Sequence, residues 1–274
     1  SGGTTTVTEG GATDSYTVVL TSQPSADVSI ALTGSEVTTG PTSLIFTSAN
    51  WATAQTVTVT AIDDAIDEAT PHAGSVTSVV TSSDSNYNGS SVAPISVSVT
   101  DNDAAGISVT PTSGLSTTEA GGTANFTVVL SSQPTGNVTI GLSSSDTTEG
   151  TVAPTSLSFT SVNWNIAQSA TITGVDDALV DGAIAYSIVT AAATSSDSNY
   201  NGLNASDVSV SNSDNDNAGV NVVESGGGTA ATEGGATDSY TVVLTSQPSS
   251  DVAVILGVGA QASLSPSNLT FTAA

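Results

Sequence analysis

Apolar and polar residues alternate along most of this chain, and short runs rich in Gly, Pro, Asn and Asp interrupt the alternation. A period of two is typical of β-strands that bury one face and expose the other to water. The polar positions are mostly Ser and Thr, which suit a strand at the surface. No segment shows the period of about 3.6 residues that an amphipathic helix requires. The pattern therefore predicts an all-β fold.

Between residues 106 and 218 the alternation predicts seven strands, the number found in an immunoglobulin-like β-sandwich. Turn residues at Gln133-Pro134, Ala153-Pro154 and Asn201-Gly202 separate some of these strands. The side chains expected to face the core are, strand by strand, Ile107 and Val109; Phe126, Val128 and Leu130; Val138, Ile140 and Leu142; Leu157 and Phe159; Ala170 and Ile172; Ile184, Tyr186 and Ile188; and Val208 and Val210.

The same pattern recurs along the chain at a spacing of about 113 residues. Trp51 returns as Trp164, and Asp63-Asp64 returns as Asp176-Asp177. A repeat of this length is a usual size for one β-sandwich domain. We therefore divide the chain into repeat one, residues 1–105, repeat two, residues 106–218, and repeat three, residues 219–274. The predicted architecture is an elongated array of tandem seven-stranded immunoglobulin-like sandwiches.

Only repeat two carries all seven predicted strands. Repeat one begins without its first strand, and repeat three holds only the first four. Half a sandwich leaves strand edges unpaired and one face bare. Two explanations remain open: the natural chain continues beyond Ala274, which the sequence favours, or strands from another copy complete the sandwich, as in donor-strand polymers.

The charge balance of the chain is extreme, with 25 Asp and Glu, one His and neither Lys nor Arg, for a net charge of −25. Such a polyanion is not expected to bind nucleic acid or anionic membrane surfaces. Without Cys there are no disulfides, and no apolar run is long enough to enter a membrane. Because no second His, Lys or Cys is present, nucleophilic triads and zinc sites lack their usual side chains. We therefore expect a protein that is not an enzyme.

The carboxylates are clustered, and their clusters fall at one end of each predicted sandwich. Successive strands reverse direction, so the loops before the second strand and before the sixth strand share an end with the end of the last strand. This distal end abuts the next repeat. In repeat two it gathers Glu119, Asp176, Asp177, Asp181, Asp214 and Asp216, and in repeat one it gathers Glu9, Asp63, Asp64, Glu68, Asp101 and Asp103, with Asp67 in addition.

Clustered carboxylates repel one another unless a cation neutralises them, and Ca²⁺ takes about six to eight oxygen ligands. Mg²⁺ fits less well because it keeps several waters. The alternative is that acidic residues merely decorate the loops of an acidic protein. Recurrence of three clusters at the same end favours calcium, and it predicts a metal-braced joint between successive domains.

These motifs resemble the Calx-β domain, the calcium-binding sandwich of sodium–calcium exchangers that is also found in large bacterial surface proteins. The shared features are a Glu before the second strand, an Asp-Asp pair followed four residues later by an acid, and an acidic closing triplet. The resemblance implies that the twelve carboxylates named above, Asp67 not included, carry Ca²⁺. The closing triplet is Asp-Asn-Asp rather than fully acidic, and for the acid expected between the third and fourth strands Glu36 and Asp146 are alternatives.

Several residues outside the acidic clusters have expected roles. Trp164 and Tyr200 are expected to pack within repeat two rather than to cap the joint, and Asp197 is a candidate ligand across the joint. His72 is expected in a loop, with Ala185 as its counterpart 113 residues later. Asn-x-Ser/Thr sequons leave glycan attachment open; they begin at Asn88, Asn125, Asn137, Asn204 and Asn268.

Together these features predict a structural segment of an extracellular or cell-surface fibre stiffened by Ca²⁺. Its partners are expected to be neighbouring repeats or other copies of the chain. The alternative is a stalk or tip module of a calcium-dependent adhesin that binds glycans or a partner cell.

Overall fold

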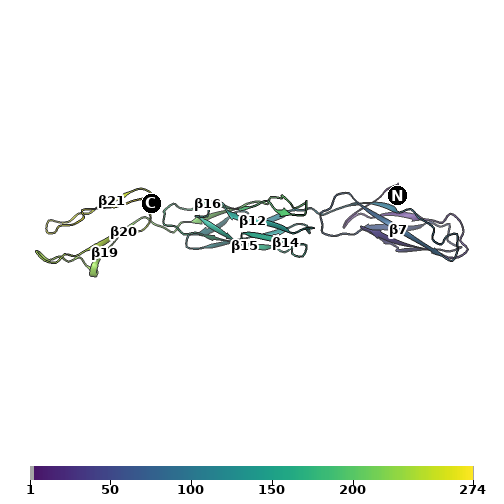
Figure 1. Ribbon diagram of the computed structural model, residues 1–274, viewed down its shortest axis with the longest axis horizontal. Helices are drawn as coiled ribbons and strands as arrows, with labels where there is room; N and C mark the ends of the chain where they lie inside the picture. Colours follow the sequence, from purple (N-terminus) through teal and green to yellow (C-terminus); the bar gives the residue numbers. More distant parts are fainter. Residues whose placement is uncertain (1–2, 274) are drawn as a thin grey trace.

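The computed structural model describes residues 3–273 as three groups of β-strands that follow one another along a single long axis (Figure 1). Helical structure within that range is limited to one short 3₁₀ turn, Ser225–Gly227. No helix among these residues is long and apolar enough to cross a membrane. The predicted all-β fold is confirmed, and the alternation of Val, Ile and Thr with Ser is its cause, because these residues favour the pleated, half-buried strand.

Repeat two is a sandwich of two sheets. One sheet has the strand order β13-β15-β11-β9, and the other has the order β10-β18-β16-β12-β14, with β17 pairing β12. Phe126, Phe159, Ile140, Ile172 and Ile188 are fully buried between the sheets. The strands are β9 (Ile107–Thr110), β10 (Leu115–Thr118), β11 (Thr123–Leu130), β12 (Val138–Ser144), β13 (Gly150–Ala153), β14 (Ser156–Phe159), β15 (Gln168–Gly174), β16 (Ile184–Thr190), β17 (Thr194–Ser195) and β18 (Val208–Ser213).

Repeat one has a similar arrangement, with sheets in the orders β1-β8-β7-β3-β5 and β2-β6-β4, but its described residues include no counterpart of β9. Its core is built around Phe46, Val28, Val57 and Val59. The strands are β1 (Thr5–Thr8), β2 (Asp14–Val18), β3 (Val28–Ser35), β4 (Val37–Gly40), β5 (Ser43–Phe46), β6 (Gln55–Ala61), β7 (His72–Ser82) and β8 (Ile95–Thr100). β1 pairs in parallel with β8 as β10 pairs with β18, so the prediction that repeat one lacks its first strand is wrong for the part that corresponds to β10.

Two strands of repeat two change sheets along their length, which the alternation did not reveal. The first strand is split into β9, which pairs antiparallel with β11, and β10, which pairs parallel with β18. The fourth is split into β13, in the sheet of β15, and β14, in the sheet of β12. Pro111 and Pro154 follow the first half of each strand, and proline has no N–H to continue a ladder. Ala153-Pro154, predicted as a turn, is therefore a crossing between sheets.

Repeat three consists of two hairpin-like pairs of strands. β19 (Val220–Glu224) pairs with β20 (Tyr240–Leu244), and β21 (Val252–Ile255) pairs with β22 (Asn268–Phe271). None of residues 219–273 is buried. Val222 and Val243 are each more than half exposed, and Ile255 is 85% exposed. Without further strands the apolar faces of these pairs remain in water.

The same backbone contacts recur at both joints between repeats. The Gln133 amide donates to the Ala65 carbonyl across the first joint, and the Gln247 amide donates to the Ala178 carbonyl across the second, each at 2.6 Å. Asn199 adds a side-chain bond from Nδ2 to the Asp67 carbonyl, also at 2.6 Å. The loop that contacts the next repeat is thus the loop that carries the Asp-Asp pair.

Tyr200 anchors the opposite, proximal end of repeat two, and it is 1% exposed. Its hydroxyl donates to the Ser132 carbonyl at 2.7 Å and accepts from the Ser132 amide at 3.0 Å. Trp164 packs against the core nearby. These contacts fit the predicted packing role of both residues.

Tyr200→Phe is expected to destabilise repeat two by about 1–2 kcal/mol, because the variant leaves buried polar groups of Ser132 without their partner. Tyr87→Phe is the matched control, since Tyr87 makes the same bonds to Ser22 in a more exposed setting. Urea denaturation of both variants measures the difference, and an equal loss in the two would contradict the role given to burial.

Candidate metal centres

Glu9 and Glu119 are placed by the parallel strand pairs. Each residue directly follows β1 or β10, and its amide donates to the last residues of β8 or β18, Glu9 to the Thr100 carbonyl at 3.0 Å and Glu119 to the Ser213 carbonyl at 3.1 Å. Because the paired strands end together, each glutamate lies beside the closing Asp-Asn-Asp triplet. Glu9 is 4% exposed and Glu119 is 2% exposed.

The loops that carry the Asp-Asp pairs are shaped by their own carboxylates. Asp64 Oδ1 accepts from the Ile66 amide and Asp177 Oδ1 accepts from the Leu179 amide, both at 2.7 Å. These are local turns of the kind that Asp favours. A second bond ties each loop to the end of the last strand: Asp101 Oδ2 accepts from the Glu68 amide at 2.6 Å.

Repeat one contains two groups in which three side chains each offer a ligand atom within 4.8 Å of the other two. One group is Glu9, Asp64 and Asp103, and the other is Glu9, Glu68 and His72. The remaining predicted ligands, Asp63 and Asp101, lie in the same cluster but outside these groups. Asp63 Oδ1 accepts from Asn102 Nδ2 at 3.0 Å, and Asp101 Oδ1 accepts from the Asp103 amide at 2.8 Å.

Repeat two likewise contains two groups, Glu119 with Asp214 and Asp216, and Glu149 with Asp177 and Asp181. Asp176 lies outside them, and its Oδ1 accepts from Asn215 Nδ2 at 3.0 Å. Asp214 Oδ2 accepts from the Asp181 amide at 3.1 Å, which repeats the bond between Glu68 and Asp101. Five of the six carboxylates predicted for this repeat thus belong to one or other of the two groups.

Glu149 was missed by the sequence analysis, which offered Glu36 or Asp146 for this place. The Asp146 carboxylate instead accepts from the amide and the hydroxyl of Thr148. Glu149 is 6% exposed, whereas Glu36, 113 residues earlier, is exposed. The spacing of 113 residues between Glu36 and Glu149 could have identified Glu149 in the sequence. The backbone confirms that the two positions are equivalent, because the Ile62 amide donates to the Glu36 carbonyl and the Val175 amide donates to the Glu149 carbonyl.

Burial and mutual repulsion disfavour the ionised form of these carboxylates and so raise their pKa values. Burial, followed by the charges of Asp101 and Asp64, raises the pKa of Glu9 to about 7. Burial also raises the pKa of Asp103, Glu149 and Asp216, with neighbouring carboxylates adding to it.

The pKa of Glu119 is also raised, although one hydrogen bond acts in the opposite direction. The Asn215 amide lowers the pKa of Glu119, but burial and the charges of Asp214, Asp177 and Asp181 together outweigh it, so the pKa is raised. A bound cation would reverse each of these shifts, because it favours the ionised carboxylate.

Three buried carboxylate oxygens in the clusters have no hydrogen-bond partner, namely Glu9 Oε2, Asp103 Oδ2 and Asp216 Oδ2. Buried polar atoms are normally satisfied, so each such atom calls for an explanation. The chain has no Lys or Arg to supply one. The donor set is almost entirely carboxylate oxygen, which suits a hard divalent cation.

Asp197, the candidate ligand across the joint, is held by hydrogen bonds within repeat two. Burial would raise its pKa, but bonds from the Thr135 amide at 2.8 Å and the Asn199 amide at 2.9 Å hold the pKa below its usual range. Asp197 belongs to none of the compact ligand groups of the described residues, and its role as a ligand across the joint stays a prediction.

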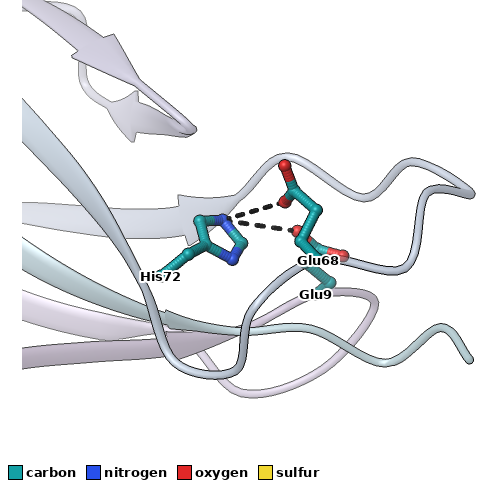
Figure 2. A group of neighbouring side chains, drawn as sticks. All are labelled: Glu9, Glu68 and His72. Atoms are coloured by element: carbon teal, nitrogen blue, oxygen red, sulfur yellow. Dashed lines mark ion pairs between the residues drawn. The ribbon is translucent and has the colours of Figure 1, made fainter. Parts of the chain in front are cut away.

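His72 is not a loop residue either, because it is the first residue of β7. Its side chain is 14% exposed, and one edge of its ring faces the carboxylates of both Glu9 and Glu68 (Figure 2). The signal available in the sequence was its place four residues after Glu68, at the start of an alternating run.

No protein-family model and no curated protein matches the chain. Among solved structures, the calcium binding domain CBD12 of CALX1.1 is 18% identical, covering 70% of this chain and 78% of that one, with a TM-score of 0.33. CBD12 from CALX1.2 is 17% identical over the same shares, with a TM-score of 0.30. Domains 4 and 5 of the S-layer protein SbsC are 21% identical, covering 57% and 68%, with a TM-score of 0.29.

Proposed function

We propose that this chain is a structural segment of an extracellular fibre in which Ca²⁺ stiffens the joints between successive β-sandwiches. The observation that carries the proposal is that one loop does two things. Residues 63–68 supply carboxylates to the cluster of repeat one, and Ala65 within the same loop accepts a hydrogen bond from Gln133 of repeat two. Residues 176–181 do the same for the second joint through Ala178.

Calcium is the ion that the donor set supports best. Glu9, Asp64 and Asp103 would hold an ion in repeat one, and in repeat two Glu119, Asp214 and Asp216 would hold one and Glu149, Asp177 and Asp181 another. When bound, the ion supplies positive charge to a cluster of carboxylates that no Lys or Arg can neutralise. Neutralised loops no longer repel one another, so the loop that contacts the next repeat becomes fixed.

The partners in this proposal are neighbouring repeats or further copies of the chain. The proposal assigns no catalytic step, because the clustered carboxylates are accounted for as ion ligands. The resemblance of the acidic motifs of this chain to those of the Calx-β domain supports Ca²⁺ as the bound ion. The alternative of an adhesin stalk or tip stays a prediction that a glycan-binding screen can test.

Small-angle scattering of the chain tests the proposal directly. With free Ca²⁺ well above its Kd we expect a straight rod, and with chelator we expect a shorter mean end-to-end length because the joints bend. Each bound ion at 100 times its Kd should also add about 2.7 kcal/mol to the free energy of unfolding. Scattering curves and melting temperatures that ignore chelator would overturn the proposal, and Mg²⁺ at the same concentration is the control for ionic strength.

A further inference from the structure

Repeat one holds a second kind of ligand set, centred on His72. His72 Nε2 lies 3.3 Å from Glu68 Oε2 and 3.9 Å from Glu9 Oε1. Figure 2 shows both carboxylates directed at the same edge of the imidazole ring. One atom from each of the three side chains lies within 4.8 Å of the other two.

Apart from the ion pairs of His72 Nε2 with Glu68 and Glu9, the polar atoms of this set have few partners. Neither Nδ1 nor Nε2 of His72 has a hydrogen-bond partner, and Glu9 Oε2 has none either. The Glu9 side chain is only 3% exposed, so water does not readily replace the missing bonds. A metal-binding His usually presents one nitrogen to the ion, and two carboxylates beside it match the charge of a divalent cation.

The geometry points to a site for a first-row divalent transition metal, with Zn²⁺ as the favoured ion, held by Glu9, Glu68 and His72. Zn²⁺ binds imidazole nitrogen and carboxylate oxygen at about 2.0–2.2 Å, which places neighbouring ligand atoms about 3.3 Å apart. The distances found here need little adjustment. Ca²⁺ prefers oxygen ligands alone, so the imidazole discriminates between the two ions. The sequence-based exclusion of zinc rested on the lack of Cys and of a second His, and it overlooked carboxylates as the remaining ligands.

The strand register confines this site to repeat one. His72 pairs with Val99 of β8, and Ile184 pairs with Asn212, which stands 113 residues after Val99 in β18. The counterpart of His72 is therefore Ile184. The sequence spacing of 113 residues had indicated Ala185, and that prediction is wrong. Ala185 is exposed, whereas Ile184 is half-buried like His72. Repeat two thus has an apolar side chain where repeat one has an imidazole.

This site goes beyond the calcium proposal, although the two share Glu9, whose two oxygens allow it to contact both ions. It makes the joint between repeats one and two responsive to an ion that the second joint does not select. The carboxylates of repeat two are untouched by substitution of His72. Loss of zinc binding is therefore distinguishable from loss of calcium binding.

The test is a titration of the whole chain with Zn²⁺ in excess Ca²⁺. Calorimetry measures the binding, and NMR monitors the ring signals of His72. Because the chain has one His, its ring signals report on this site alone. We expect one Zn²⁺ per chain, a shift of the His72 ring signals, and affinity about 100-fold weaker or worse in His72→Ala. Co²⁺ in place of Zn²⁺ should show the visible absorption of a low-coordinate complex.

A gain-of-site variant gives the matched control. Ile184→His with Asp181→Glu places the same residue types at the corresponding positions of repeat two, and we expect it to bind a second Zn²⁺. Unchanged ring signals on addition of Zn²⁺, or equal Zn²⁺ affinity in the parent chain and in His72→Ala, would overturn the assignment. The latter result would show that zinc merely replaces calcium among the carboxylates.

Discussion

Replacing Asp64 and Asp103 by asparagine is expected to let the joint between repeats one and two bend freely even in saturating Ca²⁺. Both side chains belong to one compact group, and Asp103 Oδ2 is a buried oxygen without a partner. Asparagine keeps one oxygen, so the turn bond from the Ile66 amide to position 64 survives. What is lost is charge, and each missing carboxylate should weaken calcium binding by about tenfold or more.

Distances between spin labels measure the effect. The chain contains no Cys, so Val79→Cys and Val162→Cys can be labelled without interference, and both positions are exposed, at 62% and 85%. The distance distribution between the two labels should be narrow in Ca²⁺ and broad in the double variant. The matched control is Asp177→Asn with Asp216→Asn, which alters the equivalent cluster of repeat two and should leave the first joint unchanged. A narrow distribution in both variants would show that the backbone bond from Gln133 to Ala65 is sufficient.

Much of the fold could be predicted because the responsible signals are local. A period of two fixes which side chains face the core, and reversal of direction at each turn fixes which loops share an end. The sixteen buried residues that form the hydrophobic core of repeat two all come from such strands or from the loops between them. The convergence of Glu119 with Asp214 and Asp216 follows from the same rule, and Glu119 and Asp214 are 95 residues apart in the chain.

The remaining features depend on non-local register, which the pattern does not contain. The change of sheet at Pro111 requires knowing that β10 lies beside β18. Glu149 lies in a compact group with Asp177 and Asp181, while Glu36 at the equivalent position is exposed. His72 was misplaced because four positions separate it from Glu68 but only three separate Ile184 from Asp181. A change of one residue in a loop moves a side chain to a different ligand set.

The effect of pH on stability should reverse sign when calcium is removed. In chelator, the raised pKa values of Glu9, Asp103, Glu119, Glu149 and Asp216 mean that the folded chain binds protons more tightly than the unfolded chain. Stability from such groups is fully present below their unfolded pKa values and is lost as pH rises through the folded values, which for Glu9 is about 7. Lowering the pH from 8 to 5 should therefore raise the melting temperature of the metal-free chain, by about 5 °C if Glu9 contributes about 1 kcal/mol after solvent screening.

In saturating Ca²⁺ the same change of pH should lower the melting temperature, because the ion binds only ionised carboxylates and protons compete with it. Below about pH 4 both forms should lose stability. There the hydrogen-bonded carboxylates whose pKa values are lowered, such as Asp84 and Asp197, become protonated. Thermal denaturation across pH 4–8, with and without chelator, measures both slopes, and Glu9→Gln supplies the control, since it removes the group with the largest shift and should flatten the metal-free slope. Parallel slopes in the two conditions would mean that calcium does not bind at the buried carboxylates, and would leave their raised pKa values as a property of an empty acidic cluster.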